Sequence, residues 1–93
     1  MKLRICSEEA LKLVQNGAQL LDVRSGHEFN EDGVSGAINI PLPMLVKYVG
    51  LLERNKPIIV YCRSGNRSAK AVNMLKIAGF KQVLDLGARR NYP

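Results

Sequence analysis

The chain has 93 residues, of which 46% are hydrophobic and 24% are charged, and both values are ordinary for a globular protein. They exclude a disordered or fibrous chain, and the length favours one compact domain over residues 1–93. The formal net charge of +6 favours anionic partners. No apolar run approaches the roughly 18 residues of a membrane-spanning helix, and the N-terminus lacks an apolar signal core. We therefore expect a cytoplasmic, monomeric protein with no membrane partner.

Aromatic residues and cysteines narrow the classes of partner further. Three tyrosines, two phenylalanines and no tryptophan accompany the basic residues, and no basic run extends beyond Arg89-Arg90. This composition argues against a nucleic-acid partner and favours a small anion. The two cysteines, Cys6 and Cys62, could form at most one disulfide, so we expect reduced thiols. No metal ion or cofactor is expected.

The first half of the chain alternates between helical and extended patterns. Ser7 can cap a helix that runs to Gln15 and ends at Asn16-Gly17. The apolar run "AQLLDV" over residues 18–23 predicts a buried strand. Residues 25–33 predict a loop with one helical turn, and "GAINI" over residues 36–40 predicts a second strand.

The second half repeats this alternation. Pro43 can begin a helix, and the expected apolar face of that helix consists of Leu45, Val46, Val49 and Leu52. "PIIVY" over residues 57–61 predicts the most distinct strand, residues 66–78 predict an amphipathic helix, and "KQVLDL" over residues 81–86 predicts a last strand. Strands that alternate with helices indicate a small parallel sheet flanked by helices on both faces, so the expected fold class is α/β.

Cys62 stands at the carboxyl end of the most distinct strand, where ligands bind in open parallel sheets. The residues after it, "RSGNRS", offer backbone N–H groups, a glycine that permits positive φ, and a helix start, which together favour anion binding. Arg63 and Arg67 add positive charge, so the thiol pKa should fall from about 8.5 towards or below neutrality. This pattern predicts a nucleophilic thiolate, whereas a cysteine inside a plain buried strand would be an inert small hydrophobe.

Several other polar residues have simple interpretations from their positions. Asp22 can cap the loop after its strand, and Arg24 can pair with Glu28 at helical spacing. His27, the only histidine, lies in another loop from Cys62 and is interpreted as solvated. A Cys-His pair is therefore not assured by the sequence.

The two ends of the chain carry a second thiol and a basic pair. Cys6, next to Ile5, is interpreted as a packing residue, and would act as a resolving thiol only if it reached the Cys62 loop. Arg89 and Arg90 form a solvated tail or extend the positive field near the site.

Two separated motifs, "LLDVRSGHEFNEDGVSGAINIP" and "YCRSGNRSAKA", resemble the rhodanese-like (thiosulfate sulfurtransferase) domain over about residues 7–86. The resemblance implies that Cys62 takes a sulfane sulfur from thiosulfate or a persulfide donor and passes it to cyanide or a thiol, including a protein thiol. The Cys62 loop would wrap that sulfur with main-chain amides, and Arg63 and Arg67 would attract the anionic donor. Asp22 and Arg24 match the family's Asp-Val-Arg motif, whose role is structural. The expected substrate-binding residues are Arg63, Ser64, Gly65, Asn66 and Arg67, and Ser68 joins Asp22 and Arg24 as a supporting residue.

The chain departs from the family pattern at two places. It has "DGVSGA" where the family often has Gly-His before the apolar residue and then Pro-Gly-Ala. Its "LGARRNYP" segment lacks the usual Gly-Gly and the Trp-bearing final helix. Without a bulky wall at that side of the site, larger acceptors such as protein thiols are easier to admit.

A phosphatase is one alternative, because dual-specificity phosphatases of the cell cycle resemble this fold and also place a cysteine before an anion-binding loop. In this chain Arg67 follows Cys62 after four intervening residues, one fewer than in those enzymes. A ring of amides sized for one sulfur atom should be too tight for a phosphoryl group.

A second alternative is a binding or redox-sensing module whose Cys62 carries sulfur or is oxidised without fast turnover. Exposed thiols of low pKa are the ones that oxidise, and a fold by itself does not determine a function. Turnover of thiosulfate and cyanide would separate this module from an enzyme.

Overall fold

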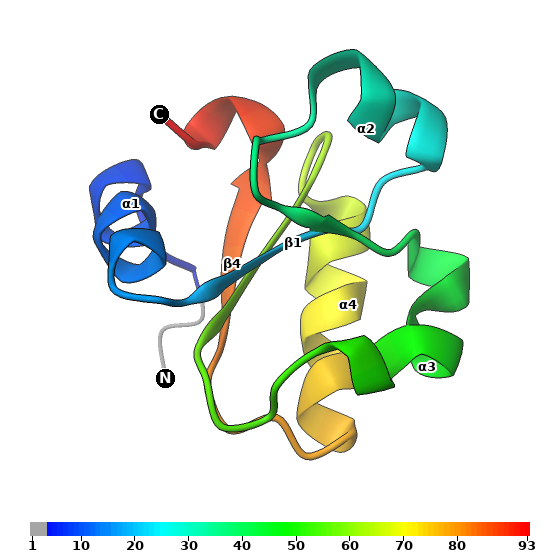
Figure 1. The fold of residues 1–93 in the computed structure, drawn as a ribbon. Helices are drawn as coiled ribbons and strands as arrows, with labels where there is room; N and C mark the ends of the chain where they lie inside the picture. Colours follow the sequence, from blue (N-terminus) through cyan, green and yellow to red (C-terminus); the bar gives the residue numbers. More distant parts are fainter. Residues whose placement is uncertain (1–3) are drawn as a thin grey trace.

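A four-stranded parallel sheet forms the centre of the computed structural model, which describes residues 4–93 (Figure 1). The strands lie in the order β2-β1-β3-β4, and every neighbouring pair is parallel. Their bounds are Gln19–Asp22 for β1, Ile38–Asn39 for β2, Ile58–Cys62 for β3 and Val83–Ala88 for β4. The predicted α/β class with a small parallel sheet is confirmed.

Helices cover both faces of the sheet, as predicted (Figure 1). Helix α1 packs on one face, and α4 and α3 pack on the other. The α-helices are α1 (Ser7–Gln15), α2 (Gly26–Asp32), α3 (Leu45–Tyr48) and α4 (Asn66–Ile77), and the 3-10 helices are η1 (Leu42–Met44), η2 (Val49–Leu51) and η3 (Arg89–Asn91). Within residues 4–93, no helix combines the length and the apolar content needed to cross a membrane.

Strand β3 is buried along its whole length, because it has strands on both sides and helices on both faces. Alternate side chains enter two separate cores, as the two-residue period of a strand requires. Ile58, Val60 and Cys62 join the core under α4 and α3. Ile59 and Tyr61 join the core under α1. The thiol of Cys62 therefore lies on the α4 side of the sheet.

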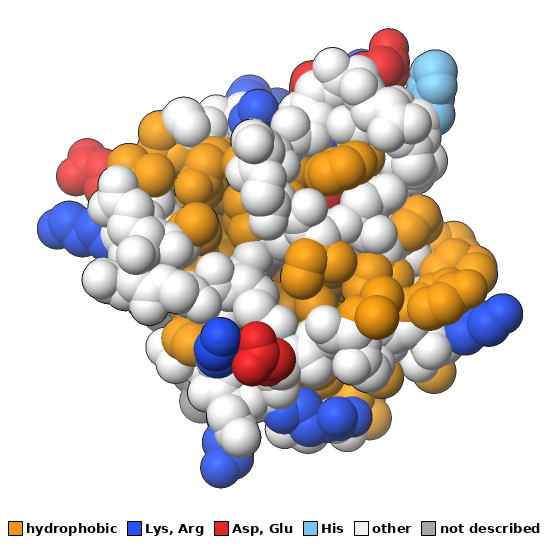
Figure 2. Space-filling view, in the orientation of Figure 1, with side chains coloured by type: hydrophobic (Ala, Val, Ile, Leu, Met, Phe, Trp, Pro, Cys, Tyr) orange, Lys and Arg blue, Asp and Glu red, His pale blue; other side chains and the backbone are white. Residues whose placement is uncertain are grey.

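The segment after Pro41 differs from the single helix that the sequence predicts. It consists of η1, α3 and η2 in succession, and each change between 3-10 and α geometry alters the angle per residue. Leu45 and Leu52 are buried as expected, but the Val46 side chain is 73% exposed. On the face shown in Figure 2, apolar side chains gather over α3.

Two element boundaries also differ from the predictions. Cys6 precedes the first turn of α1 as its cap and donates its backbone N–H to Glu9 Oε1 at 3.1 Å, so Ser7 is the first helical residue. Strand β4 continues to Ala88, two residues beyond the predicted end. A bulge between its pairings with Val60 and Tyr61 accommodates this extension.

Candidate functional site

Cys62 ends β3 and begins the loop that leads into α4. Its side chain is buried, and the backbone N–H of Gly65 donates a hydrogen bond to its Sγ at 2.9 Å. Gly65 has φ +103°, in the left-handed region that favours glycine, and it is the residue that caps α4. The chain can therefore turn one of its amides back onto the sulfur within three residues.

Hydrogen bonds lower the pKa of the Cys62 thiol. Burial alone raises this pKa, but the backbone N–H and hydroxyl of Ser68, with the amides of Gly65 and Ser64, outweigh burial and lower it overall. From the sequence we predicted that Arg63, Arg67 and the helix start lower this pKa. In the structure, hydrogen bonds are the main causes of the lowering. The Ser68 hydroxyl lies 3.1 Å from the Gly65 carbonyl oxygen, and its single proton can turn to the sulfur when the thiol ionises.

Replacing Ser68 with alanine should therefore move the Cys62 pKa upward. The thiolate fraction at neutral pH falls, so the pH profile of alkylation by iodoacetamide shifts to higher pH. Ser64→Ala is the matched control, because Ser64 acts on the thiol through its backbone amide, which alanine retains. An alkylation profile of Ser68→Ala that coincides with the wild-type profile would show that the hydroxyl does not contact the thiolate.

Arg67, in the first turn of α4, is held by a glutamate of α2. Its Nη1 and Nη2 donate to Glu28 Oε1 at 2.7 Å and to Glu28 Oε2 at 3.0 Å. This bidentate bond, with help from Ser25, lowers the pKa of Glu28 to about 2. A carboxylate with a depressed pKa contributes stability above its ordinary pKa and loses it only as the pH falls towards about 2, so the link persists at neutral pH. The loop of Cys62 is thus tied to α2.

Arg24 pairs with two aspartates, and the predicted Arg24–Glu28 pair is wrong. Its guanidinium donates to Asp22 Oδ2 at 2.9 Å and to Asp32 Oδ1 at 2.7 Å. Its backbone N–H donates to Asp22 Oδ1 at 2.8 Å, so Asp22 caps the loop after β1 as expected from its position. Asp22 is fully buried and the Arg24 side chain is 4% exposed. The Arg24–Asp32 pair connects the end of β1 to α2.

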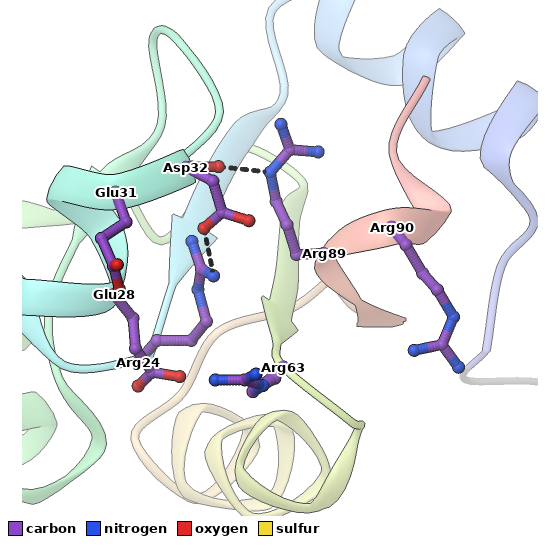
Figure 3. A pocket seen from close by; sticks show the side chains of 7 residues that line it. All are labelled: Arg24, Glu28, Glu31, Asp32, Arg63, Arg89 and Arg90. Atoms are coloured by element: carbon purple, nitrogen blue, oxygen red, sulfur yellow. Dashed lines mark hydrogen bonds and ion pairs between the residues drawn. The ribbon is translucent and has the colours of Figure 1, made fainter.

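A polar cavity of about 610 Å³ opens beside the Cys62 loop (Figure 3). Its acidic lining residues, Glu28, Glu31 and Asp32, all come from α2. Its basic lining residues are Arg24 and Arg63 and, on the opposite side, Arg89 and Arg90 of η3. From the sequence we expected the "LGARRNYP" segment to leave this side of the site without a bulky wall. In the structure, Arg89 and Arg90 of that segment line this side of the cavity.

The remaining predicted residues lie around the same loop or away from it. Ser64 and Asn66 are exposed neighbours of the buried Gly65. Cys6 is exposed at the start of α1, so its interpretation as a packing residue is wrong. His27 is exposed, as expected, and lies in α2 with Nε2 3.5 Å from Glu31 Oε1. Among residues 4–93, no three metal-binding side chains come together.

Helix α2 contributes to the site in a way that its sequence pattern did not lead us to expect. Residues 25–33 were expected to form a loop with one turn, yet they form a seven-residue helix that carries all three acidic residues of the cavity. The signal was present, because Ser25 and Glu28 form a capping box with reciprocal bonds of 3.0 and 3.2 Å. Its serine-to-glutamate spacing is visible in the sequence.

Known proteins resemble this chain in sequence and in fold. The family model of the rhodanese-like domain matches residues 7–87. YqhL of Bacillus subtilis is 32% identical over 84 residues, which cover 90% of this chain and 67% of that protein. The thiosulfate sulfurtransferase GlpE of Pseudomonas paraeruginosa is 31% identical over 89% of this chain and 76% of its own length.

Other relatives are much longer or are known as structures. The adenylyltransferase and sulfurtransferase MOCS3-1 of maize is 37% identical, but the match covers only 20% of that protein. A rhodanese-related protein of Thermoplasma volcanium superposes with a TM-score of 0.83 at 30% identity, covering 97% of this chain and 94% of its own. Together with the cysteine at the end of β3 and the loop that follows it, these matches show that the chain belongs to the rhodanese-like domain family.

Proposed function

We propose that this chain is a sulfurtransferase that moves a sulfane sulfur, through a persulfide on Cys62, from thiosulfate or a persulfide donor to cyanide or a thiol. The main support for this proposal is the hydrogen bond of 2.9 Å from the Gly65 amide, at the start of α4, to Cys62 Sγ. The lowered pKa of the Cys62 thiol supports it as well. Relatives named thiosulfate sulfurtransferase and putative sulfur carrier protein support the reaction class.

The first half-reaction loads the sulfur. The Cys62 thiolate attacks the outer sulfur of thiosulfate, the sulfur–sulfur bond of thiosulfate breaks, and sulfite leaves with the electron pair. Arg63 is an exposed cation next to Cys62 and attracts the dianion. The terminal persulfide sulfur is anionic, and the loop amides and the N-terminus of α4 stabilise it.

The second half-reaction unloads the sulfur. Cyanide or a thiolate attacks the terminal sulfur, the bond between that sulfur and Sγ breaks, and the electron pair returns to Cys62 as thiolate. Cyanide yields thiocyanate and a thiol yields its own persulfide, so neither acceptor requires an added oxidant or reductant. Arg67, held by Glu28, maintains the loop between the two steps.

The experiment follows the sulfur itself. After treatment with thiosulfate and removal of excess reagent, the intact mass should rise by one sulfur atom, and peptide mapping should place that atom on Cys62. Cyanide should remove it and release thiocyanate. Cys6→Ser is the control, and it should load and unload like the wild-type protein, because Cys6 lies outside the Cys62 loop.

The other outcomes discriminate the alternatives. A protein that gains no sulfur but hydrolyses an aryl phosphate would be a phosphatase. A protein that loads sulfur once and does not release it to cyanide or thiols would be a carrier or sensor. Either result would overturn the proposed turnover.

A further inference from the structure

Strand β4 bulges where it pairs with the end of β3. Asp85 pairs with Val60, whereas Gly87 pairs with the next residue of β3, so one residue of β4 is left over between them. Gly87 has φ +83°, and its backbone N–H donates to Asp85 Oδ1 at 2.8 Å. The bulge is therefore fixed by a carboxylate of the same strand.

This bulge lies against the turn that serves the thiol. A Cβ atom added to Gly65 would lie 3.9 Å from the Cα atom of Gly87, so the two glycines face each other closely. Gly65 donates its N–H to Cys62 Sγ at 2.9 Å, and glycine has the most permissive backbone of all residues. The direction of this N–H therefore depends on what packs around Gly65.

The guanidinium group of Arg4 covers both glycines. The chain before α1 runs beside β4, and the Ile5 backbone N–H donates to the Asp85 carbonyl oxygen at 3.1 Å. A Cβ atom at Gly87 would lie 3.0 Å from Arg4 Nη1 and 3.1 Å from its Cζ. A Cβ atom at Gly65 would lie 3.7 Å from Arg4 Nη2. One planar group thus spans the outer side of the bulge and of the turn.

The contact of Arg4 with the two glycines matters more than its ion pair. Arg4 Nη2 lies 3.7 Å from Asp85 Oδ2, farther than in a charge-assisted hydrogen bond, and the Arg4 side chain is 59% exposed. Exposed pairs of this kind contribute little to the stability of a fold. Loss of the Arg4 side chain should therefore leave the protein folded and uncover the Gly65 turn.

We propose that Arg4 is a positioning residue of the Cys62 loop, because its guanidinium plane holds the Gly65 turn against the β4 bulge and keeps the Gly65 amide aimed at the sulfur. The proposal rests on the sulfurtransferase function proposed above, and adds to it a residue that precedes the family match over residues 7–87. A less firmly held amide stabilises the anionic sulfur of Cys62 less. Arg4 acts on the reaction through Gly65.

The test replaces Arg4 with glutamine in a Cys6→Ser background, so that Cys62 is the only thiol. Alkylation of Cys62 by iodoacetamide should shift to higher pH, because the thiolate loses part of a hydrogen bond, while the plateau rate at high pH should not fall. At neutral pH, loading by thiosulfate should slow about twofold to fivefold, as expected when a hydrogen bond to a charged group is weakened rather than lost.

Two further variants separate positioning from charge and from stability. Arg4→Lys keeps the charge but replaces the plane with a single ammonium group, which cannot span both glycines, so its alkylation profile should match that of Arg4→Gln. Arg54→Gln removes an arginine that donates to the Ala78 carbonyl oxygen at the far end of α4, and its profile should match that of the background protein. The midpoint of urea unfolding is measured for every variant.

The outcomes separate this inference from the function on which it rests. An unshifted profile in Arg4→Gln would refute the positioning role, and so would a shift that Arg54→Gln reproduces. Recovery of the original profile in Arg4→Lys would show that charge alone acts, which also overturns the proposal. Failure of thiosulfate to load Cys62 in the wild-type protein would refute the sulfurtransferase function instead, and the alkylation profiles would still decide the role of Arg4.

Discussion

Cys62→Ser should reduce thiosulfate-to-cyanide transfer to background, a loss on the order of 10³-fold or more, because no covalent route remains. Serine is close to cysteine in size, so the buried position should tolerate it, and the Gly65 amide can donate to its oxygen. The serine hydroxyl does not ionise near neutral pH and cannot form a persulfide. The measurement is steady-state thiocyanate production, with circular dichroism to verify the fold.

Cys6→Ser serves as the matched control for this experiment, since it removes the other thiol of the chain. It should retain transfer within about twofold of wild type, as surface substitutions usually change little. Substantial activity in Cys62→Ser would contradict the assignment of the nucleophile. The nucleophile would then have to be Cys6, or the transfer would have to follow a route that uses no cysteine.

Asp22→Ala should destabilise the fold by about 3 to 5 kcal/mol, the usual cost of leaving a buried charge without its partner. Arg24 is almost wholly buried, and it would keep only Asp32, whose side chain is 61% exposed. The Arg24 backbone N–H would also lose its acceptor at 2.8 Å. The measurement is the midpoint of urea unfolding, with Asp22→Asn as a milder variant that folds if alanine prevents folding.

Glu53→Gln is the surface comparison for Asp22→Ala. Glu53 pairs with Lys56 at 3.1 Å, but both side chains are more than half exposed, so its loss should cost no more than about 1 kcal/mol. The double variant Asp22→Ala/Arg24→Met should recover part of the stability lost in Asp22→Ala, because no buried charge is left unpaired. An Asp22→Ala protein as stable as Glu53→Gln would show that Arg24 is adequately solvated without Asp22.

The elements that could be predicted are those decided by local pattern. The apolar run before Cys62 indicated a fully buried strand, and the rule for parallel sheets then placed the thiol at the edge where ligands bind. The glycine at residue 65 indicated a turn with positive φ, because residues other than glycine rarely adopt that conformation. These inferences need only the neighbours of each residue in the chain.

The parts that escaped prediction depend on contacts between distant segments. Helical spacing favoured Arg24 as the partner of Glu28, but Arg67, 39 residues further along, holds that carboxylate in a bidentate bond. The choice arises because the sheet brings the starts of α2 and α4 to the same edge, and local spacing carries no information about that. Likewise, the η3 arginines become a cavity wall only because β4 delivers them beside α2.

The burial of β3 makes its backbone harder to open than the walls of the site. A central strand paired on both sides exchanges its amide hydrogens only when most of the domain opens, so it belongs to the slowest cooperative unit of the fold. Helices α2 and η3 contain no buried residue and can open locally at much lower free energy. In the proposed transfer, the sulfur atom would therefore be carried on a backbone that stays still, and any local opening of the site would occur at α2 and η3.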